Sequence, residues 1–125
     1  MCVLLGCQNQ VKLEGLKRAL EASGYEVLAV SSKQSWENLK STGYPNRVQV
    51  VISEYRLGSF FGHDMVAEIN FRMPALIWGA RKSWLDSIRK AVCFPNLTFT
   101  EETMSPEKIS QCVTQLKSAQ ALEKV

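Results

Sequence analysis

The sequence predicts a single α/β domain in which five βα units form a doubly wound, five-stranded parallel sheet with helices on both faces. Three observations support this fold class. Short apolar runs alternate with amphipathic segments along the chain. A length of 125 residues suits one domain with an ordinary core, and no repeat or low-complexity segment interrupts the alternation. Right-handed crossovers then place helices on both sides of the sheet.

The first two βα units occupy the N-terminal third of the chain. Residues 3–5 form a continuous apolar run, as expected for a strand buried on both faces. A leucine stripe with helical spacing follows, and Gly24 can end that helix in a left-handed conformation; the stripe comprises Leu13, Leu16 and Leu20. Residues 25–30 are the second expected strand, and Ser32 can cap the short helix after it.

The remaining three units extend to about residue 117. Residues 48–52 are the strongest predicted strand, because four of the five are Val or Ile. Residues 75–78 and 97–99 are the other two strands. The helices between and after them carry their apolar stripes at Met65, Val66 and Ile69, at Leu85, Ile88 and Val92, and after the helix start Ser105-Pro106-Glu107. We expect a domain over residues 1–117, with 118–125 as a helix extension or the start of a linker.

The composition excludes several classes of protein. Hydrophobic residues make up 46% and charged residues 22%, as in ordinary globular proteins, and no apolar run approaches the roughly 18 residues that span a bilayer. The N-terminus lacks the basic start of a signal peptide, so we expect a cytoplasmic protein without membrane contact. The net charge of +3 is too small to predict nucleic-acid binding. Four cysteines without a Cys-x-x-Cys pair, and one histidine, predict neither a metal site nor a cofactor.

The residues that follow each strand are the candidate site, because ligands of open parallel sheets bind outside the carboxyl ends of the strands. The most specific segment is Val50-Val51-Ile52-Ser53-Glu54-Tyr55-Arg56-Leu57-Gly58, followed by Gly62-His63-Asp64-Met65-Val66. It resembles the receiver domains of two-component response regulators, which often read V-I-S-D-Y-R-L-G there. The resemblance covers the chain from residue 3 to about 116. It implies a flavodoxin-like, CheY-like fold and a role in signalling.

Receivers of that family transfer a phosphoryl group with five polar positions. These are two acids after the first strand, an aspartate after the third, a Ser or Thr after the fourth and a Lys after the fifth. The resemblance places Cys7, Gln8, Glu54, Gly79 and Glu102 at these positions, with Glu101 as an alternative for the last. A thiol and an amide are poor ligands for Mg²⁺, and an acid in place of the lysine reverses the charge toward a phosphoryl group. We therefore predict a degenerate receiver, or pseudo-receiver, that has no enzymatic activity.

Several residues leave two interpretations open. Glu54 could imitate a phosphorylated aspartate, although a solvated strand-end acid is favoured. Phe99 matches the aromatic switch position of the family, although a static strand aromatic is favoured. Trp84, Phe60 and Phe61 are candidates for a partner surface, and packing onto the sheet is the alternative for each. A buried, unreactive thiol is favoured for Cys7, and a surface position at a helix start is favoured for His63.

The predicted function is that of a phosphorylation-independent protein-interaction module in signal transduction or transcriptional regulation. Its partner would be a kinase, an output domain or a second copy bound through the face formed by the last two helices and the last strand. Nucleic acid would be contacted only through a separate output domain. The alternative is an atypical receiver that is phosphorylated or ligand-gated around Glu54. A nucleotide-binding domain is disfavoured, because no G-x-G-x-x-G or G-x-x-x-x-G-K-[ST] loop follows a strand.

Overall fold

The computed structural model describes residues 2–43, 47–70, 72–91 and 94–123, and it confirms the predicted doubly wound sheet. Five parallel strands lie in the order β2-β1-β3-β6-β7. They are β1 (Cys2–Gly6), β2 (Glu26–Val30), β3 (Val48–Glu54), β6 (Ala75–Trp78) and β7 (Leu97–Thr100). The strand order reverses between β1 and β3, so the carboxyl ends of these two strands frame the crevice in which doubly wound folds bind ligands.

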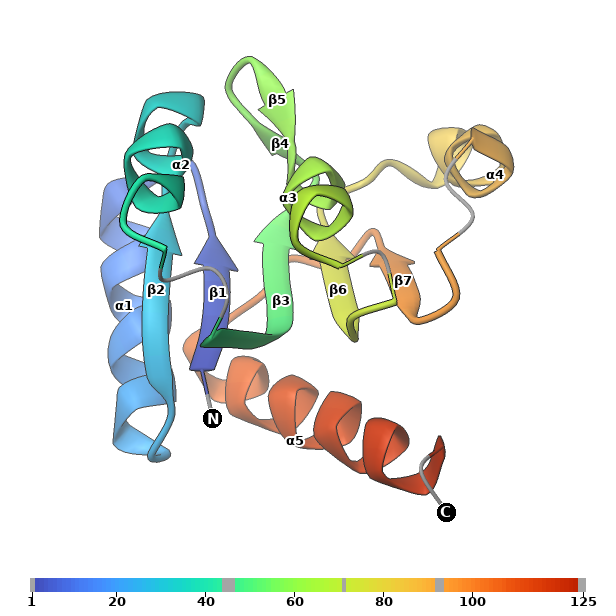
Figure 1. The fold of residues 1–125 in the computed structure, drawn as a ribbon. Coiled ribbons are helices and arrows are strands. Elements are labelled where there is room, and N and C mark those ends of the chain that lie inside the picture. The colour runs from blue at the N-terminus through green and yellow to red at the C-terminus, as the bar shows by residue number, and fades with distance from the viewer. Residues whose placement is uncertain (1, 44–46, 71, 92–93, 124–125) are drawn as a thin grey trace.

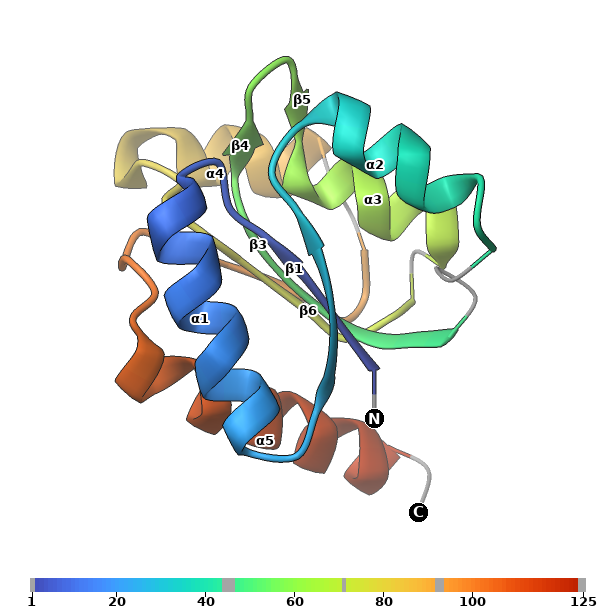
Figure 2. The same cartoon turned by 90° about the vertical axis from the view of Figure 1, so that its left-hand side faces the viewer.

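Helices cover both faces of the sheet, as Figures 1 and 2 show. The helices are α1 (Gln10–Ala22), α2 (Lys33–Lys40), α3 (Gly62–Ile69), α4 (Lys82–Ala91) and α5 (Pro106–Glu123). One core layer packs α1 and α5 against Leu5 and Ile52 of the sheet. A second layer packs α2 and α3 against Leu4 and Val51. The period-2 alternation of strand side chains therefore divides the apolar runs between two cores.

Local signals set the ends of several helices. The side chain of Asn9 accepts a hydrogen bond from the backbone N–H of Lys12 at 3.1 Å and so caps α1. Gly24, just past the end of α1, has a φ of +91°, which confirms the predicted left-handed exit. Ser32 caps α2, as the sequence predicts, and Ser35 donates and accepts the reciprocal bonds of a capping box.

The segment after β3 contains a hairpin that the sequence analysis did not predict. Strands β4 (Arg56–Leu57) and β5 (Phe60–Phe61) pair antiparallel across a two-residue turn, in which Gly58 has a φ of +70°. Figure 1 shows this hairpin beyond the carboxyl end of β3. Of the predicted apolar stripe of α4, Val92 lies outside the described residues. No helix within the described ranges is long and apolar enough to cross a membrane.

Candidate functional site at the strand ends

The structure brings three of the five predicted pocket residues together. Cys7 and Gln8 follow β1, and Glu54 ends β3, on the neighbouring strand. The backbone N–H of Gln8 donates a hydrogen bond of 2.7 Å to Oε1 of Glu54. Glu54 is half-buried, so its carboxylate is partly solvated and also held by the backbone of the β1–α1 loop. The Glu54 carboxylate reaches across the crevice because the unpaired amide of the β1–α1 loop offers it a donor.

Cys7 is a buried thiol, as the sequence analysis favoured. Its side chain has no solvent exposure, and its S–H donates to the backbone carbonyl of Asn9 at 3.6 Å. Burial and then the nearby negative charge of Glu54 raise the pKa of Cys7 to about 11. The thiol therefore stays protonated at neutral pH, which disfavours reaction as a thiolate.

The other two predicted pocket residues, Gly79 and Glu102, follow β6 and β7. Gly79 follows β6 with a φ of +80°, a conformation that disfavours residues with a side chain and above all β-branched ones such as threonine. Glu102 follows β7, and its carboxylate lies 3.9 Å from Nζ of Lys108, on the first turn of α5. Both of those side chains are mostly exposed, so this ion pair is weak. No described contact links Glu102 to Glu54.

Two glycines allow a close approach beneath the pocket. Ser53 is fully buried and donates from Oγ to the carbonyl oxygen of Glu54 at 2.9 Å. A Cβ atom on Gly6 would lie 2.2 Å from that Oγ, and one on Gly62 would lie 2.4 Å from the backbone oxygen of Glu54. The floor of the crevice therefore requires glycine on both sides of Ser53.

An aromatic cluster adjoins the crevice on its other side. Tyr55 is central: its ring centroid lies 5.0 Å from that of Phe61, 6.2 Å from that of Trp84 and 6.4 Å from that of Phe99. His63 stacks on Tyr55 at 5.9 Å and on Phe61 at 5.5 Å. Such centroid separations are typical of stabilising aromatic pairs.

His63 lies in the first turn of helix α3, as expected, and it is partly buried there. Its side chain is half-buried in the aromatic cluster, and its Nδ1 is buried without a hydrogen-bond partner. Burial lowers the pKa of His63, and the neighbouring Asp64 opposes this shift. The neutral imidazole is therefore the form that the cluster holds at neutral pH.

The four aromatic residues singled out from the sequence separate into two groups. Phe99 is buried, at 7% exposure. Trp84 and Phe61 are 44% and 36% exposed, so both remain candidates for contact with a partner. Phe60 is 9% exposed and belongs to the core, which makes its assignment to a partner surface wrong. The alternation of side chains along β5 explains why adjacent phenylalanines differ.

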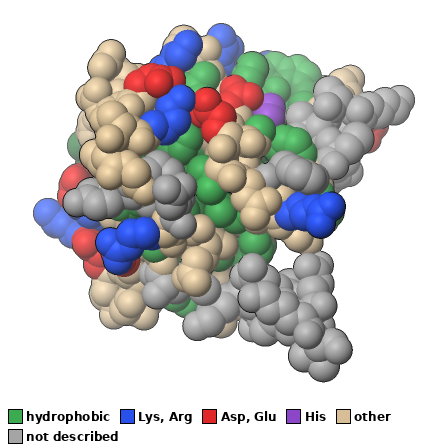
Figure 3. All heavy atoms as spheres, in the orientation of Figure 1, with side chains coloured by type: hydrophobic (Ala, Val, Ile, Leu, Met, Phe, Trp, Pro, Cys, Tyr) green, Lys and Arg blue, Asp and Glu red, His purple; other side chains and the backbone are tan. Residues whose placement is uncertain are grey.

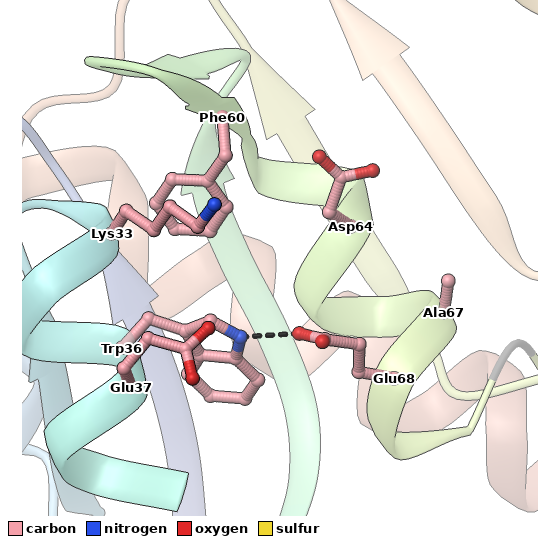
Figure 4. A pocket seen from close by; sticks show the side chains of 7 residues that line it. All are labelled: Lys33, Trp36, Glu37, Phe60, Asp64, Ala67 and Glu68. Atoms are coloured by element: carbon pink, nitrogen blue, oxygen red, sulfur yellow. Dashed lines mark hydrogen bonds between the residues drawn. The ribbon is translucent and has the colours of Figure 1, made fainter.

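A cavity of about 320 Å³ lies between α2 and α3, with Phe60 at one end (Figure 4). Several polar groups in and beside it are paired with one another. The indole N–H of Trp36 donates to Glu68, Lys40 pairs with Glu68 and with Glu37 at 3.0 Å each, and Asp64 accepts from the backbone N–H of Phe61. Figure 3 shows acidic and basic side chains close together on one face of the molecule. We assign this network a structural role.

A second cavity, of about 440 Å³, lies between the β4–β5 hairpin and the start of α4. Its lining comprises Tyr55, Arg56, Phe61, Gly79, Arg81 and Trp84. The sequence analysis missed Tyr55, Arg56 and Arg81. These residues lie shortly after β3 and β6, at the strand ends where open parallel sheets bind ligands. No charged partner close in the sequence marks them as site residues.

Comparison with known proteins supports the fold. No protein-family model matches the chain, and no curated protein matches it by sequence. A response regulator receiver domain from Clostridium thermocellum superposes with a TM-score of 0.73 over 97% of both chains at 20% identity. A CheY-like receiver domain from Methanospirillum hungatei JF-1 superposes with a TM-score of 0.72 over 98% of this chain and 97% of that chain, at 12% identity. The chemotaxis response regulator CheY4 of Vibrio cholerae superposes with a TM-score of 0.68 over 92% of this chain and 97% of that chain, at 18% identity.

These similarities define the class of fold. The chain has the CheY-like receiver fold over nearly its whole length. At these levels of identity the likeness establishes the architecture, and the chemistry has to be argued from the residues at the strand ends.

Proposed function

We propose that this chain is a pseudo-receiver, which acts in signal transduction or transcriptional regulation by binding a protein partner without being phosphorylated. The observation that carries the proposal is the hydrogen bond between Glu54 and the backbone of Gln8. Glu54 stands at the position of the phosphorylated aspartate. The hydrogen bond occupies one of its carboxylate oxygens with the loop in which phosphorylatable receivers hold a metal ion.

The surroundings of Glu54 support the same conclusion. Mg²⁺ requires several hard oxygen ligands in near-octahedral geometry. Here the adjacent thiol of Cys7 is neutral, and Gln8 offers an amide in place of a carboxylate. Glu102, at the position of the phosphoryl-binding lysine, is directed to Lys108. An acyl phosphate at Glu54 would therefore lack the acid pair that holds Mg²⁺ and the lysine after the fifth strand that offset its charge in the family.

Titration with Mg²⁺ and beryllofluoride, followed by NMR, tests the proposal. A phosphorylatable receiver domain, run in parallel, should show saturable shifts at its third and fourth strands. This chain should show none at Gln8, Glu54 or Gly79. Saturable shifts at those three amides would instead support the alternative, an atypical receiver that takes a phosphoryl group at Glu54.

Partner binding rests on Trp84 and Phe61, the exposed aromatic residues of this edge. Exposed tryptophans often anchor protein interfaces. Candidate partners are a kinase, an output domain or a second copy of the chain docked on the face formed by α4, β7 and α5. Sedimentation of the chain tests whether it binds a second copy of itself. Binding assays with a candidate kinase or output domain, comparing the parent with Trp84→Ala, test the other two; an unchanged affinity would remove Trp84 from the surface.

A further inference from the structure

We propose that the cavity between the β4–β5 hairpin and the start of α4 binds a small planar organic anion, namely an aromatic ring that carries a phosphate or carboxylate group. This site is distinct from the crevice around Glu54, and the proposal does not depend on whether Glu54 is phosphorylated. The volume of about 440 Å³ lies within the range of small-molecule pockets, roughly 300 to 1,000 Å³.

The charge of the cavity favours an anion. Two arginines line it, Arg56 and Arg81, and no described acidic residue does. Neither guanidinium forms an ion pair with any residue that the structure describes. Glu54 is next to Tyr55 in sequence, but one oxygen of its carboxylate accepts from Gln8. Guanidinium groups match phosphate and carboxylate oxygens in a bidentate geometry.

Both arginines are held in place by neighbouring groups. Cζ of Arg81 lies 4.9 Å from the centroid of the Trp84 ring, in a cation–π contact. Nε of Arg56 donates to the backbone carbonyl of Gly58 at 3.3 Å, within the hairpin. Such restraints reduce the side-chain entropy that is lost when a ligand binds. An anionic group therefore meets cations that are already oriented.

The aromatic lining favours a flat ring next to the anionic group. Phe61 and Trp84 are both at least one-third exposed, and Tyr55 packs against each of them. A planar ligand can cover this exposed aromatic surface by stacking. Gly79 leaves the floor of the cavity open, because a Cβ atom built on it has no neighbour within 4 Å. In the α2–α3 cavity, by contrast, both Glu37 and Glu68 are paired with Lys40.

The experiment separates the ring, the charge and the type of anion. Five probes are titrated into the intact chain: adenosine 5′-monophosphate, adenosine, inorganic phosphate, 2-naphthoate and 2-naphthamide. Binding is followed by NMR at the Gly79 amide and the Trp84 indole, and by tryptophan fluorescence. Trp36 and Trp78 are each 1% exposed, so quenching by a stacked ligand should arise from Trp84 and be lost in Trp84→Phe.

We expect at least one of the two aromatic anions to bind with millimolar or better affinity and ~10-fold more tightly than its neutral counterpart and than phosphate alone. A preference for one of the two aromatic anions identifies the anionic group, phosphate or carboxylate, that the cavity binds. Arg81→Gln should weaken that binding ~10-fold, and Arg56→Gln should weaken it less because one of its donors is already engaged. Arg18→Gln, on the exposed side of α1, is the matched control and should change nothing.

Three outcomes would overturn the proposal. The first is that neither aromatic anion shifts Gly79 or Trp84 at millimolar concentration. The second is that the neutral probes bind as well as the anions, which would reduce the cavity to an apolar surface. The third is that Arg81→Gln and Arg18→Gln have equal effects, which would reduce the binding to non-specific charge attraction. None of these outcomes bears on the Mg²⁺ and beryllofluoride test at Glu54.

Discussion

Replacing Gly6 with alanine should destabilise the domain through a single steric conflict with Ser53. The new Cβ would lie 2.2 Å from Oγ and 2.9 Å from Cβ of Ser53, and 3.0 Å from Cδ1 of Leu57. Ser53 is fully buried within β3 and cannot move away without disturbing the strand pairing of β1 and β3. Overpacking of this kind costs about 1–3 kcal/mol, and we expect the loss in the free energy of unfolding to fall in that range.

A double-mutant cycle isolates the conflict. Ser53→Gly removes both nearest atoms and leaves the flexible tip of Leu57 as the closest neighbour of the new Cβ. The single change should itself cost about 1–2 kcal/mol, because it removes the hydrogen bond to the Glu54 carbonyl and places glycine in a strand. In that background Gly6→Ala should cost less than about 0.5 kcal/mol, giving a coupling energy of about 1–2 kcal/mol.

Gly62→Ala is the matched control. Its Cβ would lie 2.4 Å from the backbone oxygen of Glu54, which Ser53→Gly leaves in place, and 2.5 Å from Oγ and 2.9 Å from Cβ of Ser53, which Ser53→Gly removes. Its cost should therefore fall only in part in the Ser53→Gly background, because the conflict with the backbone oxygen persists. Urea unfolding followed by far-UV circular dichroism measures all five variants, with equal m-values as the condition for comparing them. If Gly6→Ala is as costly with glycine at 53 as with serine, the steric explanation is refuted.

Three further predictions concern single residues at the strand ends. Gly79→Ala should lower the free energy of unfolding in urea by about 1 kcal/mol, because the φ of Gly79 is +80°. Gly15→Ala, whose Cβ would have no neighbour closer than 3.9 Å, should instead stabilise α1 by about 0.5–1 kcal/mol. This explanation is refuted if the two substitutions change the free energy of unfolding in the same direction. Since burial lowers the pKa of His63, the unfolded chain binds the proton first, and the free energy of unfolding should fall as the pH drops below 6.5. His63→Phe should reduce that fall, and an unchanged pH profile would contradict the assignment. Cys7 has a pKa of about 11 and no solvent exposure, so it should react with iodoacetamide at pH 8 more slowly than the half-buried Cys112. Peptide mass spectrometry measures both rates, and they should converge when the chain is unfolded in urea.

The sheet could be predicted because each strand is a contiguous apolar run and each helix carries its own stripe. Residues 75–78 are a predicted strand with the same bounds as β6, and Ser32 and Gly24 act as the sequence indicates. The β4–β5 hairpin was missed because strands of two residues are too short to show a period. Its turn glycine, Gly58, is a local signal, but the polar cluster before it and the two phenylalanines after it were both assigned to a loop.

The site was predicted less completely because its contacts join residues distant in sequence. The pairing of Gln8 with Glu54 spans 46 positions, and nothing in either local sequence indicates it. The burial of His63 depends on Tyr55 and Phe61 folding over it, which follows from the hairpin and not from helical periodicity. Phe60 and Phe61 could be identified as unusual, yet the residue facing the core depends on strand register, since a shift of one residue exchanges the two faces.

The distribution of charge connects these features to function. A phosphorylatable receiver requires its positive side chain and its acidic residues to face one another across a single pocket. In this chain the Glu54 carboxylate accepts a hydrogen bond from the backbone N–H of Gln8 in the β1–α1 loop, and the position after β7 holds an acid. The cationic groups of this edge lie instead on the hairpin and after β6, at Arg56 and Arg81, beside exposed aromatic rings. An anion drawn to this edge would therefore settle over β6 and away from Glu54, which separates any binding function from phosphoryl chemistry.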